Sequence, residues 1–114
     1  MPFQAVNPAT GELVQTFEGI SDVNLDLALG TAQQAYETDW RLRPVTERAK
    51  IVSRAATILR EKADEYAGYL TLEMGKRMAE SHFEVALSAD ILDYYAKRAE
   101  SYLEQSPPVI VCIC

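Results

Sequence analysis

Two short runs of strand-forming residues lie near the start of the chain. Phe3–Val6 and Leu13–Phe17 are rich in β-branched and aromatic residues, and a stretch containing proline and glycine separates them. Such side chains suit the pleated, half-buried surface of a sheet. The pattern predicts a β-hairpin or a pair of extended arms.

Helical periodicity begins after the second run. Ser21 and Asp22 can cap a helix over residues 23–38 by accepting a free backbone N–H of its first turn. In the following loop, residues 39–44, we expect Trp40 to fill an apolar site. Thr46 is then the next candidate cap. A long apolar face follows it, made of Ala49, Val52, Ala56, Leu59, Ala63, Tyr66 and Leu70.

Two glycines interrupt this second helical stretch. Gly68 costs about 1 kcal/mol relative to alanine inside a helix, so we expect a bend or a join between two helices near residues 62–68. Gly75 is expected to end the segment because glycine accepts the left-handed backbone that a helix end often needs, and Lys76 to satisfy carbonyl groups there. The interleaved charges at residues 60–65 predict a solvent-exposed face with i,i+4 ion pairs.

The third helical stretch, residues 77–103, combines a charged face with one apolar stripe that is rich in aromatic residues. The stripe consists of Phe83, Leu87, Ile91, Tyr94, Tyr95, Ala99 and Tyr102. Pro107 and Pro108 follow the helix, and residues 109–114 are an apolar tail with the composition of a strand. As an exposed strand, this tail would favour aggregation.

Composition and charge exclude several function classes. The 114 residues, 48% hydrophobic and 25% charged, are typical of one small globular domain. A net charge of −6 argues against nucleic acid as a partner, because phosphate binding depends on lysine and arginine. The chain shows no signal peptide and no apolar run near the roughly 20 residues that cross a bilayer. We therefore expect no membrane association and a cytoplasmic location.

Few residues offer chemistry of their own. The glycines at positions 11, 19, 30, 68 and 75 do not form a phosphate-binding loop. Cys112 and Cys114 lack the basic surroundings that activate a thiol, and together they supply only two of the four ligands of a structural zinc site. His82 is expected to be a solvated or partly covered histidine with a carboxylate neighbour. We predict no catalytic residue, no cofactor-binding residue and no metal ligand.

Two motifs connect the chain to a known family. Asn7-Pro8-Ala9-Thr10-Gly11-Glu12 and Leu72-Glu73-Met74-Gly75-Lys76 resemble the amino-terminal part of NAD(P)-dependent aldehyde dehydrogenases. The residues between them are most similar to the succinate-semialdehyde dehydrogenase type. The resemblance implies an α/β parent protein with a Rossmann-type cofactor domain. Residues 1–106 would be a mostly α-helical amino-terminal part of that domain with a β-hairpin, and residues 107–114 a tail outside the family.

The resemblance also implies an activity for the parent protein. Such an enzyme oxidises a small aldehyde, here succinate semialdehyde, to the acid with NAD or NADP as cofactor, and forms homo-oligomers. The family's catalytic cysteine, general-base glutamate and cofactor loop have no counterpart among these 114 residues. We therefore expect a truncated dehydrogenase that is inactive alone and binds no cofactor.

One helix of the family lines the mouth of the aldehyde tunnel, and residues 77–103 resemble it through Tyr94-Tyr95-Ala96. By this resemblance Phe83 and Leu87 lie at the substrate entrance; the alternative is that both are ordinary core residues. Two other functions stay open. The first is a small helical module that binds a full-length dehydrogenase subunit or another partner. The second is a thiol or metal protein that uses Cys112 and Cys114.

Overall fold

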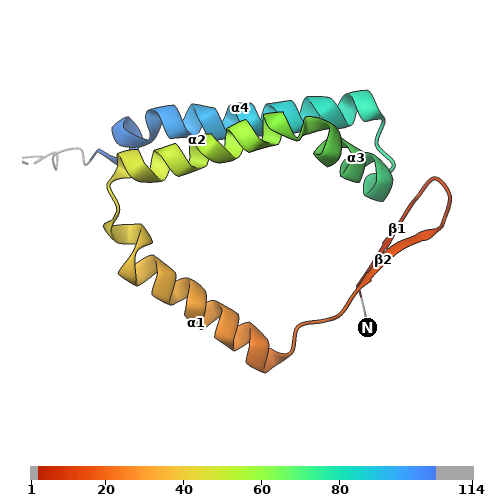
Figure 1. Cartoon of the computed structure of the whole chain (residues 1–114), viewed down its shortest axis with the longest axis horizontal. Coiled ribbons are helices and arrows are strands. Elements are labelled where there is room, and N and C mark those ends of the chain that lie inside the picture. Colours follow the sequence, from red (N-terminus) through yellow and green to blue (C-terminus); the bar gives the residue numbers. More distant parts are fainter. Residues whose placement is uncertain (1–2, 105–114) are drawn as a thin grey trace, which may run out of the picture.

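Residues 3–104 are described by the computed structural model, so the predictions for residues 107–114, with Cys112 and Cys114, lie outside the described part (Figure 1). The described residues form a two-stranded hairpin, four α-helices and one 3-10 helix. Their bounds are β1 Phe3–Val6, β2 Leu13–Phe17, α1 Asp22–Thr38, η1 Trp40–Leu42, α2 Val45–Glu61, α3 Ala63–Met74 and α4 Met78–Leu103.

The hairpin has the predicted strands. β1 and β2 pair antiparallel from Phe3 opposite Phe17 to Val6 opposite Leu13, with an irregularity after Ala5. In the connecting turn the Ala9 N–H donates to the Asn7 side chain at 2.9 Å, and Gly11 adopts a φ of 75°. Both features are typical of turns: the Asn side chain accepts a hydrogen bond in place of a backbone carbonyl, and Gly adopts a positive φ without steric cost.

Helix α1 begins as predicted but lacks a covering partner in the described chain. The Asn24 N–H donates to Ser21 Oγ at 3.3 Å, which confirms Ser21 as the cap. None of the helix's residues is buried, and Val23 and Leu27 are 69% and 64% exposed. In Figure 1, α1 stands apart from α2, α3 and α4. Capping therefore sets where α1 starts, but packing within residues 3–104 does not hold it.

The packed part of the molecule consists of α2, α3 and α4. Helix α4 lies antiparallel beside α2 in Figure 1 and also contacts α3. The buried residues are all small or medium in size: Ala56, Ala67, Ser81, Val85 and Ala89. Small side chains let helix backbones approach closely, so this core depends on close fit rather than on large apolar groups. Within residues 3–104, every helix is too short or too polar to span a membrane.

The boundaries around α2 test two of the predictions. The join expected near residues 62–68 occurs at Lys62, whereas Gly68 stays inside α3. Thr46 was wrong as a cap: α2 starts at Val45 after Pro44, and Thr46 lies within its first turn, where its hydroxyl does not cap the helix. Proline is tolerated at a helix start because the N–H that it lacks would have no helical partner there.

Long-range ion pairs join α2 to α4. Arg60 donates to Asp90 and to Asp93, each at 2.8 Å, and Ser53 Oγ donates to Asp93 at 3.1 Å. The hydrogen bond from Arg60 lowers the pKa of Asp93 below that of free aspartate. The face at residues 60–65 is mostly exposed, as predicted, but the i,i+4 ion pairs expected there were wrong. Arg60 reaches across to α4, and Lys62 pairs with Glu65 three residues away.

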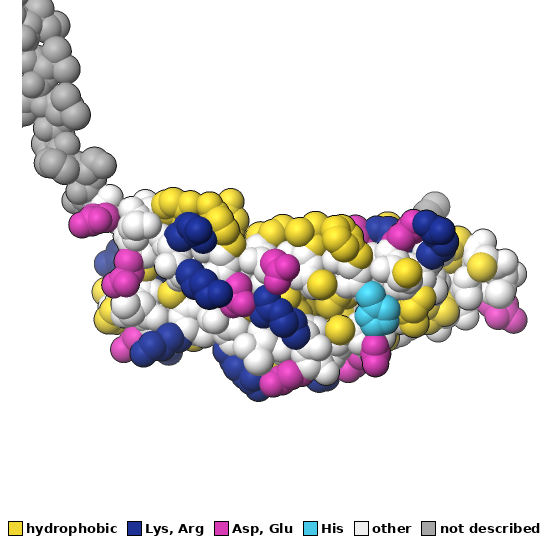
Figure 2. Space-filling model, turned by 90° about the horizontal axis from the view of Figure 1, so that it is seen from above, with side chains coloured by type: hydrophobic (Ala, Val, Ile, Leu, Met, Phe, Trp, Pro, Cys, Tyr) yellow, Lys and Arg dark blue, Asp and Glu magenta, His cyan; other side chains and the backbone are white. Residues whose placement is uncertain are grey.

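The chain is more open than a self-contained domain of its length. Its radius of gyration is 20.4 Å, whereas a compact domain of this length has about 13 Å. Figure 2 shows hydrophobic side chains gathered along one long edge of the molecule, beside a face on which both signs of charge are mixed. An exposed apolar surface of this extent is characteristic of an interface.

Candidate substrate-entrance face and neighbouring hollows

Phe83 and Leu87 lie one helical turn apart on the outside of α4. Their exposed fractions are 68% and 44%, and Ile91, one turn further, is 48% exposed. The inner side of α4 is instead formed by Ser81, Val85 and Ala89. Phe83 and Leu87 are therefore not core residues of the described chain, and they form with Ile91 an uncovered apolar face, which we call the α4 face.

Tyrosines occupy the carboxyl-terminal half of α4. The hydroxyls of Tyr94 and Tyr102 are hydrogen-bonded at 2.9 Å, and the ring of Tyr95 meets that of Tyr94 edge-on with 5.3 Å between centroids. The Arg98 guanidinium lies 3.9 Å from the Tyr94 ring centroid. The hydrogen bond to Tyr94 raises the pKa of Tyr102. These contacts fix the aromatic rings on the surface of α4.

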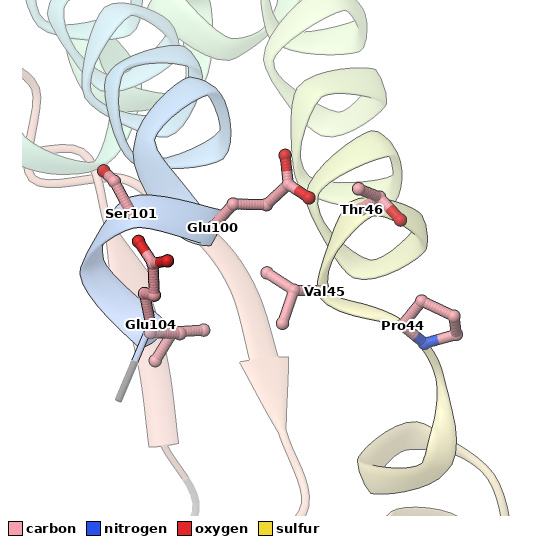
Figure 3. Close-up of a pocket in the computed structure, with 7 residues that line it drawn as sticks. Pro44, Val45, Thr46, Glu100, Ser101 and Glu104 are labelled. Atoms are coloured by element: carbon pink, nitrogen blue, oxygen red, sulfur yellow. The ribbon is translucent and has the colours of Figure 1, made fainter. Parts of the chain in front are cut away.

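A wide hollow of about 590 Å³ lies between the start of α2 and the end of α4 (Figure 3). Its lining is Pro44, Val45, Thr46, Glu100, Ser101, Leu103 and Glu104. The carboxylate of Glu100 reaches across toward α2 in Figure 3. The lining contains neither histidine nor cysteine, and the Ser101 hydroxyl donates to the Arg98 backbone carbonyl at 3.0 Å rather than to a carboxylate.

A smaller apolar hollow of about 170 Å³ lies between α2, α4 and η1. Its lining is Trp40, Val45, Arg48, Ala49, Val52, Tyr95, Ala96, Ala99 and Leu103. Trp40 is half-buried, as expected for a residue that fills an apolar site. The Nε atom of Arg48 is buried and has no hydrogen-bond partner among the described residues.

His82 is half-exposed, and its Nε2 lies 3.4 Å from Asp64 Oδ1 on α3. The prediction of a partly covered histidine beside a carboxylate is confirmed, with Asp64 as the partner. Within residues 3–104, no group of three or more His, Cys, Asp or Glu residues is placed to hold a metal ion.

The two family motifs meet in space, which sequence reasoning missed. Gly75 ends α3 with a φ of 67°, and its N–H donates to the Thr71 carbonyl at 3.0 Å. A Cβ atom added to Gly75 would lie 2.8 Å from Cγ of Pro8, so the hairpin turn rests directly against this glycine. Lys76 was wrongly expected to bond backbone carbonyls, because its ammonium pairs with Glu84 on α4. Each motif contains a glycine, Gly11 or Gly75. Because glycine lets another segment approach the backbone closely, these glycines were the signal in the sequence that could have indicated the contact.

The described residues contain no glycine-rich dinucleotide loop of the G-x-G-x-x-G type. Among residues 3–104 the glycines are too widely spaced for a G-x-G-x-x-G loop, and the two with positive φ, Gly11 and Gly75, lie in a hairpin turn and at a helix end.

Comparisons with known proteins agree with the motifs. The aldehyde dehydrogenase family model matches residues 1–110. The succinate-semialdehyde dehydrogenase [NADP(+)] of Deinococcus radiodurans is 48% identical over 103 residues, which cover 90% of this chain and 21% of the relative. The chain thus spans about a fifth of the length of this relative.

Solved structures give the same result. The structure of Gox0499 superposes with a TM-score of 0.94 at 32% identity, over 97% of this chain and 24% of its own. Succinic semialdehyde dehydrogenase from Streptococcus pyogenes, solved in complex with NADP+, gives a TM-score of 0.87 at 37% identity, over 93% and 23%. The prediction of a mostly helical region with an amino-terminal hairpin, taken from an aldehyde dehydrogenase fold, is confirmed. The chain belongs to the aldehyde dehydrogenase family.

Proposed function

We propose that this chain is the amino-terminal helical part of an enzyme that oxidises succinate semialdehyde to the acid with NADP+ as hydride acceptor. The observation that supports this is the 48% identity to the Deinococcus radiodurans succinate-semialdehyde dehydrogenase [NADP(+)]. The 37% identity to the Streptococcus pyogenes enzyme in complex with NADP+ agrees with it. By the same family relationship, we propose a cytoplasmic homo-oligomer.

Within that enzyme, the contribution of this region is physical rather than chemical. Phe83 and Leu87 present adjacent apolar side chains on the α4 face, and we place them at the mouth of the aldehyde tunnel. An apolar mouth contacts the methylene groups of the substrate and keeps bulk water from the reacting centre. The nucleophile, base and hydride acceptor then come from outside residues 3–104.

A second candidate is a small helical module that binds a full-length dehydrogenase subunit. The uncovered face of α1, where no residue is buried, favours it. The two candidates differ in the behaviour of the isolated chain. A monodisperse product with a cooperative unfolding transition supports the module, whereas an insoluble or molten product supports a region that needs the rest of an enzyme.

The test is a chimera: the Deinococcus radiodurans enzyme with its 103 matched residues replaced by the corresponding residues of this chain. We expect it to oxidise succinate semialdehyde with NADP+. Phe83→Ala and Leu87→Ala are each expected to raise its KM for the aldehyde roughly ten-fold and to change kcat less, because they remove apolar contacts made in both the ground and transition states. Steady-state kinetics at saturating NADP+ measures both constants.

Ile91→Ala is the matched control, since Ile91 lies on the same face with an exposure of 48%, close to the 44% of Leu87. Its KM is expected to stay near that of the chimera. A folded chimera that binds NADP+ and does not oxidise the aldehyde contradicts the proposed function. Equal KM changes in all three variants contradict the assignment of the entrance to Phe83 and Leu87.

A further inference from the structure

The apolar hollow between Trp40 and Leu103 has the size of a receptor site for one side chain. Its volume of about 170 Å³ is close to that of cavities of ~150 Å³ that bind a benzene ring. Apart from Arg48, the lining consists of aromatic and aliphatic residues of η1, α2 and α4. A hollow with this lining favours an apolar group such as a leucine or phenylalanine side chain.

Arg48 adds a polar requirement to this hollow. Its Nε is buried without a hydrogen-bond partner among the described residues. Four other arginines, Arg43, Arg54, Arg60 and Arg77, have carboxylate partners within residues 3–104, and Arg48 is not among them. A buried donor left unpaired is costly, and a guanidinium is best satisfied by a carboxylate, which accepts two parallel N–H bonds.

We propose that this hollow anchors a segment from the remainder of the dehydrogenase polypeptide, which inserts an apolar side chain beside Trp40 and places a carboxylate on Arg48. This inference rests on the proposed function. The matched relative has about four-fifths of its length outside the part that this chain covers, since the match spans 21% of it. Two of the lining residues, Tyr95 and Leu103, are also 58% and 59% exposed, so they offer apolar area at the rim of the hollow to the same segment.

Trp40 makes the site measurable, because it is the single tryptophan of the chain and lines the hollow. The probe is 4-phenylbutanoate, which carries an apolar ring and a carboxylate, and the matched control is 4-phenylbutan-1-ol. We expect a saturable shift of Trp40 fluorescence with the carboxylate and at least roughly ten-fold weaker binding of the alcohol. The titration uses the 114-residue chain, whose helical circular dichroism is recorded first.

Two variants make the test specific. Arg48→Met is expected to bring the affinities of carboxylate and alcohol together, whereas Arg54→Met, on the same helix, keeps the preference for the carboxylate. Ala99→Leu is expected to fill the hollow and to weaken both probes while Arg48 stays in place. Helical circular dichroism equal to that of the parent chain shows that each variant is folded.

Several results would overturn the proposal: no saturable response, equal affinities for the two probes in the parent chain, or an unchanged preference in Arg48→Met. A Trp40 shift that depends on protein concentration without probe, together with a dimer mass in sedimentation, assigns the hollow to a second copy and also overturns it. A parent chain without helical signal does the same. No readout depends on aldehyde oxidation, so an inactive chimera and an empty anchor site are distinguishable.

Discussion

Replacing Ala89 by leucine is expected to lower the free energy of unfolding by about 2 to 3 kcal/mol. Ala89 is fully buried where α4 packs in the three-helix unit, whose other buried residues are also small. Three additional carbon atoms force the helices apart or drive side chains from their preferred rotamers, since protein interiors are already close-packed. Urea unfolding followed by helical circular dichroism measures the loss as a lower midpoint at constant slope.

Ala86→Leu is the matched control, because Ala86 lies on the same helix and is exposed. Its effect is expected to stay within about 0.5 kcal/mol of zero, as for most surface substitutions. Equal effects of the two leucines would mean that α4 does not pack through its small-residue side, and the description of the core would then be wrong.

The second large effect is expected at Gly75. Gly75→Ala should destabilise the chain by about 1 to 2 kcal/mol from the left-handed backbone alone, and its Cβ also collides with Pro8 at 2.8 Å. Gly68→Ala should stabilise it by up to about 1 kcal/mol, since Gly68 lies inside α3 and an added Cβ meets no atom within 4 Å. The same glycine-to-alanine change is thus expected to lower the free energy of unfolding at Gly75 and to raise it at Gly68, seven positions away, in the same urea experiment.

A double-mutant cycle separates the two causes at Gly75. Pro8→Ala removes the ring atom that the new Cβ would strike, so Gly75→Ala should cost less when it is combined with Pro8→Ala. Additive effects would show that backbone strain is the whole cause. Destabilisation of the same size at Gly68 and Gly75 would contradict the left-handed helix end.

Most elements of the fold were predictable because local chemistry determines them. The hairpin strands have the predicted bounds, and Ser21 and Gly75 mark a helix start and a helix end through contacts with near neighbours. The error at Thr46 has a local cause as well. Pro44 occupies the cap position before α2 and makes no side-chain hydrogen bond, so a search for capping hydroxyls misses this helix start.

Tertiary contacts were less predictable. Periodicity identified the large apolar residues of α4, but the described chain buries Ser81, Val85 and Ala89 and leaves Phe83 at 68% exposure. A sequence pattern shows which face of a helix is apolar, not which polypeptide covers it. The contact of Pro8 with Gly75 and the buried Nε of Arg48 depend on segments far apart in the chain, so no local rule predicts them.

The placement of Phe83 and Leu87 at a substrate entrance stays a prediction, as does the division of the chain at residue 106. Both came from resemblance to the family. What the structure adds for Phe83 and Leu87 is their position on one exposed side of α4, where a further part of an enzyme can reach them.

Helices α2, α3 and α4 support one another, whereas we expect α1 and the hairpin to require the rest of a dehydrogenase to hold them. Native-state hydrogen exchange of the 114-residue chain tests this claim most directly. We predict slow amides only in α2, α3 and α4, and near-unprotected exchange in α1, β1 and β2, which contain no buried residue. Amides of α1 that exchange as slowly as those of α4 would contradict the claim, as would fast exchange throughout.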